Sequence, residues 1–161
     1  MSEPTQSTQM IVERVIPATP EQIFALLADP DRHQETEPTD WVRGALPPKR
    51  TITEVGQVFG IEMHHVNAGG RYEMHNRVIA LEPGRTIAWE PSQYSEQGEL
   101  QGGGWTWRYD LAPEESGTRV TLTYDWSATP EPLRDQLSLP PFGSDFLDES
   151  LASLDRAVTS S

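Results

Sequence analysis

Residues 105–111 read Trp105-Thr106-Trp107-Arg108-Tyr109-Asp110-Leu111, so large apolar or aromatic side chains alternate with polar ones. A period of two is typical of a β-strand with one covered face and one wet face. The same alternation runs through residues 59–65, 72–80, 87–90 and 120–126. It predicts an antiparallel sheet whose inner face carries the aromatic residues and whose outer face carries charged residues.

The predicted inner face is unusually rich in indole and phenol groups. Trp and Tyr are rarely buried completely and need partners for their polar atoms. Four Trp and three Tyr on one face therefore favour a ligand cavity over a dry core. The whole inner set is Phe59, Ile61, Met63, His65, Tyr72, Met74, Asn76, Val78, Ala80, Ile87, Trp89, Trp105, Trp107, Tyr109, Leu111, Val120, Leu122, Tyr124 and Trp126.

Length and charge narrow the class of protein. The 161 residues are expected to form a flexible tail at 1–9 and a single domain at 10–161. A net charge of −13 disfavours binding to nucleic acid and to anionic membranes, because phosphate groups need clustered cations. The chain has no cysteine, no apolar stretch long enough for a membrane span and a polar start, from which we expect a cytoplasmic protein.

Start signals place the helices. Thr19-Pro20-Glu21-Gln22 combines an N-cap, a proline in the first turn and a capping-box Gln after a strand at 10–16. Asp29-Pro30 predicts a second short helix, and Trp41-Val42 a brief strand. Ser144-Asp145 starts a long final helix with the apolar stripe Phe146, Leu147, Leu151, Leu154 and Val158.

Two hairpin registers follow from the alternation. A loop at Asn67–Gly70 sets Met63 opposite Met74 and His65 opposite Tyr72 inside, with Glu62 facing His75 and His64 facing Glu73 outside. A loop at Glu82–Arg85 sets Val78 opposite Trp89, Ala80 opposite Ile87, and Arg77 opposite Glu90. A third hairpin turns near Glu114–Gly117. The Gly-rich segment between Pro91 and Gly104 reads as a loop without strands, with Gly102-Gly103-Gly104 as a flexible hinge.

The order of these motifs resembles the START-like, or SRPBCC, superfamily. The matching stretches are 16–24, 27–30, Glu82–Trp89, Trp105-Thr106-Trp107, Thr118-Arg119-Val120, Tyr124-Asp125-Trp126 and the final helix. The resemblance is closest to the polyketide cyclase/dehydrase-like branch. It implies an α+β helix-grip fold, in which a curved antiparallel sheet wraps a long C-terminal helix, two short helices follow the first strand, and a hydrophobic cavity is enclosed.

The histidines divide between the two faces. His64 and His75 are expected on the outer face beside acidic residues, and His65 points the other way, so a shared metal site is disfavoured. For His65 two interpretations stay open. It is either a core histidine bonded to Tyr72 or a backbone carbonyl, or a polar anchor or general base in the pocket.

The candidate ligand-binding residues are the inner aromatic, thioether and amide groups together with two flanking rings. They are Trp41, Ile61, Met63, His65, Tyr72, Met74, Asn76, Trp89, Trp105, Trp107, Tyr109, Tyr124, Trp126 and Phe142. We expect about half of the aromatic rings to be core and the rest to line the cavity. His65 is the candidate catalytic residue, and no metal or cofactor is expected.

Several functions remain in competition. The leading hypothesis is a binding protein for an apolar or aromatic, polycyclic or polyketide-like small molecule. If it is an enzyme, the resemblance implies cyclase or aromatase chemistry by aldol closure and dehydration, although no inward carboxylate accompanies His65. The alternatives are sequestration without chemistry, as in transport, sensing or self-resistance, and an interaction module like the Hsp90-activator branch. The oligomeric state is not indicated.

Overall fold

The computed structural model describes residues 8–36, 42–47, 50–65, 69–130, 132 and 143–159. The early elements are β1 (Gln9–Ile16), α1 (Pro20–Leu27), the 3-10 helix η1 (Pro30–Thr36) and β2 (Val42–Ala45). The strands that follow are β3 (Val58–His65), β4 (Gly70–Glu82), β5 (Thr86–Glu90), β6 (Ser92–Tyr94), β7 (Leu100–Gly102), β8 (Thr106–Glu114) and β9 (Gly117–Asp125), and α3 (Ser144–Thr159) closes the chain.

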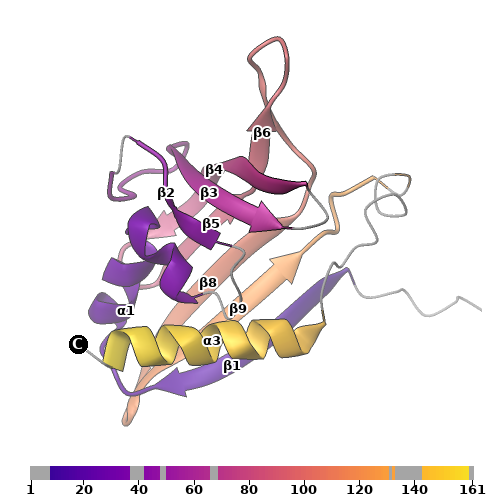
Figure 1. The fold of residues 1–161 in the computed structure, drawn as a ribbon. Helices are drawn as coiled ribbons and strands as arrows, with labels where there is room; N and C mark the ends of the chain where they lie inside the picture. The colour runs from indigo at the N-terminus through magenta and orange to yellow at the C-terminus, as the bar shows by residue number, and fades with distance from the viewer. Residues whose placement is uncertain are drawn as a thin grey trace, which may run out of the picture.

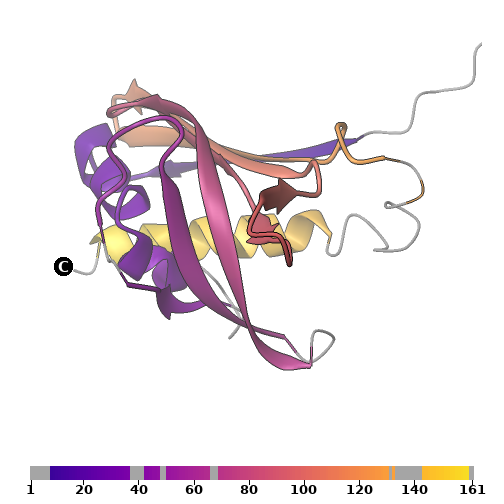
Figure 2. The ribbon, with the colours of Figure 1, turned by 90° about the horizontal axis from the view of Figure 1, so that it is seen from above.

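The main sheet is antiparallel and has seven strands in the order β1-β9-β8-β5-β4-β3-β2. Figure 1 shows α3 lying across one face of this sheet, and Figure 2 shows the sheet curling around the helix. The helix packs mainly on β1, η1, α1 and β9. The expected α+β helix-grip architecture, with two short helices after the first strand, is confirmed.

The predicted start of the first helix is confirmed in detail. The Thr19 hydroxyl accepts from the Gln22 backbone N–H at 3.1 Å, and the Gln22 side chain accepts from the Thr19 backbone N–H at 2.9 Å. After it, the Asp29 carboxylate accepts from the Asp31 N–H at 3.1 Å, which starts η1. Strand β1 begins at Gln9, so this residue belongs to the sheet rather than to the expected tail.

The first hairpin keeps the predicted faces but not the predicted register. Met63 lies opposite Tyr72, Ile61 opposite Met74, and Glu62 opposite Glu73, a shift of two residues. The shift by an even number leaves each side chain on its face. The expected Met63–Met74, His65–Tyr72, Glu62–His75 and His64–Glu73 pairs are therefore wrong. The like charges at Glu62 and Glu73 are bridged by Arg71, which hydrogen-bonds to both carboxylates.

The second and third hairpins follow the prediction more closely. Val78 faces Trp89, and Arg77 faces Glu90 with an ion pair of 3.0 Å. A bulge between Val78 and Ala80 then sets Leu81, and not Ala80, opposite Ile87. The expected Ala80–Ile87 pair is wrong for this reason, since a bulge adds one residue to one strand. The third hairpin closes at Glu114 and Gly117 as predicted.

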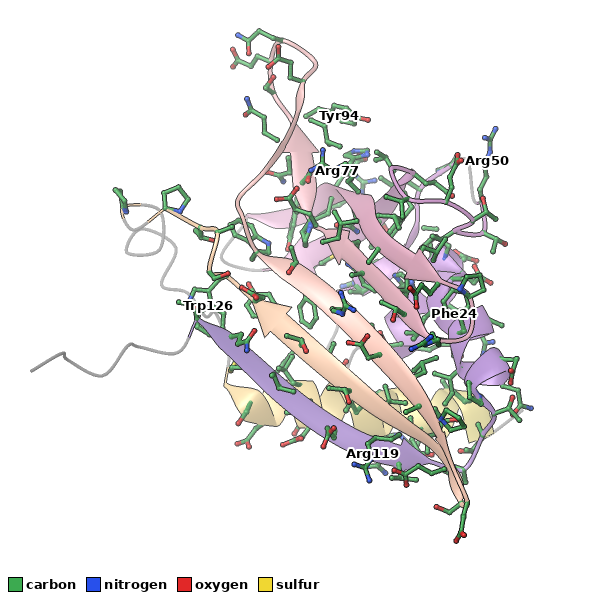
Figure 3. All side chains as sticks on the ribbon, turned by 180° about the vertical axis from the view of Figure 1, so that it is seen from behind. Phe24, Arg50, Arg77, Tyr94, Arg119 and Trp126 are labelled. Carbon is green, nitrogen blue, oxygen red and sulfur yellow. The ribbon has the colours of Figure 1, made fainter. Side chains whose placement is uncertain are left out.

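The outer face of the sheet carries a small hairpin that the sequence did not reveal. Strands β6 and β7 pair across the segment expected to be an irregular loop, so that expectation is wrong. The Tyr94 ring lies 4.8 Å from the His75 ring, and the Gln93 side-chain amide donates to the Glu73 carbonyl at 3.3 Å. These contacts tie the hairpin to β4. Figure 3 shows Arg77, Tyr94 and Arg119 from this side.

The core lies between the inner face and the helices. Leu147, Leu151 and Leu154 of α3 are buried among sheet residues such as Val120 and Leu122, while Phe146 and Val158 pack at the margin. This confirms the predicted stripe of α3. None of the helices within the described ranges is long and apolar enough to cross a membrane.

A close backbone approach holds the β8–β9 turn against the end of β1. Gly117 has a φ of 144°, and a Cβ added there would lie 2.1 Å from the carbonyl oxygen of Ile16. Next to it, the buried Thr118 hydroxyl donates to the Ala18 carbonyl at 2.7 Å. Only a glycine allows this contact without moving one of the two backbones.

We expect Gly117→Ala to lower the free energy of unfolding by more than about 2 kcal/mol, because it combines an unfavourable φ with a backbone collision. Gly84→Ala is the matched control, since Gly84 also has a positive φ of 74° but nothing within 4 Å of an added Cβ. Urea unfolding of both variants measures the difference. Equal losses in the two would show that the contact with Ile16 is unimportant.

Candidate functional site

A cluster of four rings forms what we call the aromatic floor of the inner face. The ring of His33 lies 5.0 Å from that of Trp89 in a stacked arrangement and 5.4 Å from Phe59 edge to face. Trp89 is also 5.5 Å from Phe59 and 5.9 Å from Tyr109. All four are buried. The floor thus joins η1 to β3, β5 and β8 through aromatic contacts.

His33 is the one member of the floor that lies outside the strands and that their alternation does not predict. Its Nε2 lies 2.7 Å from the Leu27 carbonyl oxygen, which can only accept, so Nε2 carries the proton. Burial lowers the pKa of His33, against smaller opposing effects of the Leu27 carbonyl and Asp29. The imidazole is therefore neutral near pH 7. The sequence does contain a signal for the burial of His33. Pro30 and His33 are three residues apart and so share one face of a short helix, which follows the core residues Leu26 and Leu27.

A polar network holds the floor from the helix side. The Ser150 hydroxyl of α3 donates to the Thr36 carbonyl at 2.6 Å, and the Thr36 hydroxyl donates to the His33 carbonyl at 2.8 Å. Burial raises the pKa of Tyr109 to about 12, and hydrogen bonds shared with Ser150 and Thr36 partly oppose the rise. Burial also raises the pKa of Tyr124. Both phenols are therefore neutral at physiological pH and fixed in place.

Beyond the floor, the inner face is only half covered. We call its half-buried members the open wall: Met63, Tyr72, Met74, Trp105 and Trp107. Met63, Trp105 and Trp107 still pack against the core, whereas Tyr72 and Met74 lie outside the packed core cluster. Along β4 the exposure therefore increases from Val78, which is buried, to Tyr72 near the end of the strand.

Asn76 sits where the covered and half-covered parts of β4 meet. It lies opposite Phe59 across the β3–β4 ladder, and only 6% of its surface is exposed. Its side chain makes no hydrogen bond to any other residue in the described ranges. The amide is not among the side-chain groups that are both fully buried and unpartnered, so it keeps some contact with solvent and can be reached by a ligand.

Trp105 takes its orientation from a glycine. A Cβ added at Gly103 would lie 1.9 Å from the indole ring of Trp105, so the ring rests directly on the Gly103 backbone. Gly102 belongs to β7. The Gly102-Gly103-Gly104 run, expected to be a flexible hinge, is thus in part a strand end and in part a seat for this ring.

The structure separates the other predicted site residues into distinct groups. Ile61, Trp89, Tyr109, Tyr124 and Trp126 are buried in the core, and their assignment as ligand-binding residues stays a prediction. Trp107 stacks near Tyr124 at 4.9 Å, and Tyr124 lies 5.7 Å from Trp126. Trp41, Phe142 and the His65 side chain fall outside the described part of the chain. Their roles stay predictions.

The other two histidines lie on strands outside the aromatic floor. His64 is opposite Arg71 across the ladder, and His75 approaches Glu73 at 3.6 Å. Among the residues that the structure describes, no group of three His, Asp or Glu side chains is arranged to hold a metal ion.

The buried, neutral His33 predicts a dependence of stability on pH. The unfolded chain takes up a proton at this site near pH 6.5, while the folded chain does so only at lower pH. Stability is therefore fully present above pH 6.5 and is lost as the pH falls below it, by up to about 1.4 kcal/mol per pH unit. Urea unfolding between pH 7.5 and 5.5 should show this loss. The slope should shrink in His33→Gln and persist in His64→Gln, whereas an unchanged slope in His33→Gln would contradict the assignment.

Comparison with solved structures shows the same fold in several bacterial proteins. Protein NE0264 of Nitrosomonas europaea aligns with a TM-score of 0.73 at 14% identity, covering 98% of this chain and 97% of that one. A protein of Arthrobacter aurescens aligns with a TM-score of 0.71 at 15% identity over 99% and 91% of the two chains. An AHSA1-like protein of Aeromonas hydrophila aligns with a TM-score of 0.58 at 18% identity over 92% and 93%.

Comparison of sequences identifies relatives and a family. Protein Rv0088 of Mycobacterium tuberculosis is 33% identical over 118 residues, which are 73% of this chain and 46% of that protein. The chain thus spans about half of the length of the curated relatives that it matches. The profile of the family described as polyketide cyclase / dehydrase and lipid transport matches residues 7–159. The chain therefore belongs to this family, within the START-like superfamily that its motif order resembles.

Proposed function

We propose that the protein binds an apolar, ring-containing small molecule of polyketide-like chemistry, seated between the open wall of the sheet and α3. The family description is consistent with binding of such a ligand. The observation that carries the proposal is the exposure gradient along β4, where Asn76 is buried without a described partner and Met74 and Tyr72 lie beyond the core. A ligand against this strip would cover apolar surface and reach a polar group that positions it.

The chemistry of the open wall favours rings over flexible chains. Trp105, Trp107 and Tyr72 offer flat faces on which a planar molecule can stack, and such contacts add about 0.5–1.5 kcal/mol each beyond the buried area. Met63 and Met74 are soft side chains that adapt to the outline of a ligand. A linear alkyl chain gains the buried area but not the stacking.

The outer face argues against the interaction-module alternative. It carries ion pairs between Arg77 and Glu90, Arg108 and Asp110, and Arg119 and Glu114. Exposed large apolar side chains do occur among the described residues, at Ile11, Val15, Val55, Val58, Ile79 and Tyr94. An interface for a partner protein needs a contiguous apolar patch, and the charged pairs interrupt these positions.

Ring closure is a separate step from binding. Cyclase chemistry needs a group that moves a proton between carbon and oxygen atoms of the bound chain. We propose His65 for that role on the basis of the sequence. Incubation with a linear poly-β-ketone substrate separates the two cases, since a cyclase releases a ring product and a carrier returns the substrate unchanged. A His65→Ala variant with unchanged turnover would remove His65 from the mechanism.

Binding itself is tested by calorimetric titration with 2-naphthol as a planar probe and 1-decanol as a linear one. We expect the wild-type protein to bind 2-naphthol more tightly. We expect Trp107→Leu to weaken binding of 2-naphthol by roughly tenfold or more, because it removes a stacking face from the open wall.

The matched control is Ile79→Ala, which truncates an apolar residue that is 40% exposed, outside the packed core. It should leave the affinity for 2-naphthol unchanged. Failure of the wild-type protein to bind any planar apolar probe would overturn the proposed function. Equal losses in Trp107→Leu and Ile79→Ala would locate the binding elsewhere.

A further inference from the structure

Two polar groups lie at the aromatic floor, and each has at least one hydrogen-bonding atom without a partner among the described residues. One is the side-chain amide of Asn76, which has no hydrogen bond to another described residue. The other is Nδ1 of His33, because the single hydrogen bond of the imidazole runs from Nε2 to Leu27. Both side chains are only 6% exposed, but neither polar group is fully enclosed without a partner, so each stays within reach of a small molecule.

The two groups share the same neighbours. Asn76 lies opposite Phe59 in the β3–β4 ladder, and the His33 ring meets the Phe59 ring edge to face at 5.4 Å. Trp89 stacks on His33 at 5.0 Å and pairs with Val78, two positions along β4 from Asn76. Diagonal neighbours on one face of a sheet are within reach of long side chains. The Phe59–Trp89 pair therefore places Asn76 and His33 beside the same two rings of the aromatic floor.

The hydrogen-bonding character of each group is fixed. Since Nε2 of His33 donates to a carbonyl, Nδ1 has no proton in the neutral ring and can only accept. Asn76 can both donate and accept. A hydroxyl group meets both demands, because its hydrogen can be donated to Nδ1 while its oxygen accepts from the Asn76 amide.

The surroundings also disfavour a negative charge on the ligand. The inner-face positions of β3, β4, β5, β8 and β9 that the structure describes carry no Asp, Glu, Lys or Arg. Arg14 of β1 is paired with Asp155 of α3 at 2.8 Å. A carboxylate group beside the floor would lose its hydration without gaining a counter-charge, and Asp29, which acts electrostatically on His33, would repel it.

We propose that His33 and Asn76 form the polar subsite for a neutral hydroxyl group on the bound ring, and that the natural ligand is therefore an uncharged hydroxylated aromatic. This inference rests on the proposed function. A phenol satisfies both residues with one oxygen, and a hydroxyl next to a carbonyl satisfies them with two. The subsite assigns a task to the two described polar groups that the fold leaves without one.

Three probes of the same ring system test the subsite: 2-naphthol, 2-methoxynaphthalene and 2-naphthoate. The methyl ether keeps the rings but cannot donate to Nδ1, and the acid brings a negative charge. We expect the full-length protein to bind 2-naphthol about tenfold more tightly than the ether, because a neutral hydrogen bond in a buried site is lost. We expect 2-naphthoate to bind most weakly.

Matched variants locate the discrimination. Asn76→Leu and His33→Phe keep the side-chain size and should reduce the naphthol-to-ether affinity ratio to about one, while ether binding persists. His75→Phe makes the same change outside the floor and should keep the ratio. A ratio that persists in both inner variants, or equal binding of naphthol and ether by the wild type, would overturn the subsite and leave the proposed function standing. Loss of all three probes in the wild type would overturn the proposed function itself.

A measurement on the unmodified protein covers the case in which His33→Phe does not fold, since that change also removes the hydrogen bond to Leu27. Nitrogen-15 NMR of histidine-labelled protein reports the two ring nitrogens of His33. Added 2-naphthol should move the Nδ1 resonance in the direction of hydrogen-bond acceptance, and 2-methoxynaphthalene should not. Identical spectra with the two ligands would count against the proposal.

Discussion

A single helix has to cover a face built by seven strands. At about 4.8 Å between neighbouring strands the face is roughly 29 Å wide, while a helix with its side chains is only about 10 Å across. Curling of the sheet around α3 reduces the area of the inner face that the helix leaves uncovered, and η1 covers part of what is left. The half-buried aromatic and thioether side chains of the open wall lie in the strip left over. The architecture thus leaves part of the inner face half exposed before any residue is specialised there.

The polar groups beside the aromatic floor are placed by the same elements that make the fold. His33 is held by its own hydrogen bond to the end of α1, by stacking on Trp89 and by the Thr36 hydroxyl on its carbonyl. Ser150 ties this arrangement to α3. A neutral imidazole with a fixed tautomer therefore results from ordinary packing and capping contacts. Ionised groups such as Arg77, Glu90 and Arg119 lie on the outer face and pair there, whereas Arg14 of β1 pairs with Asp155 of α3.

The alternation of residues predicted the face of the strand residues outside the β4 bulge, because a register shift of two residues leaves every side chain on its face. It could not predict the register at Glu62, since Arg71 reconciles two like charges that simple pairing would avoid. It also could not foresee the bulge that brings Leu81 inside in place of Ala80. The alternation also could not predict how deeply each inner residue is buried. Trp89 and Trp107 share a face and lie opposite each other, yet only Trp89 is buried. The elements that cover the sheet are distant in sequence, so the pattern within a strand carries no sign of them.

The contact between Gly103 and Trp105 shows how a residue outside the main sheet can shape its inner face. The indole ring is seated on backbone in the connection from β7 to β8. A methyl group at position 103 would collide with the ring and force it to move, with no substitution among the open-wall residues themselves. The shape of this half-buried surface can therefore change through a glycine that is not part of it.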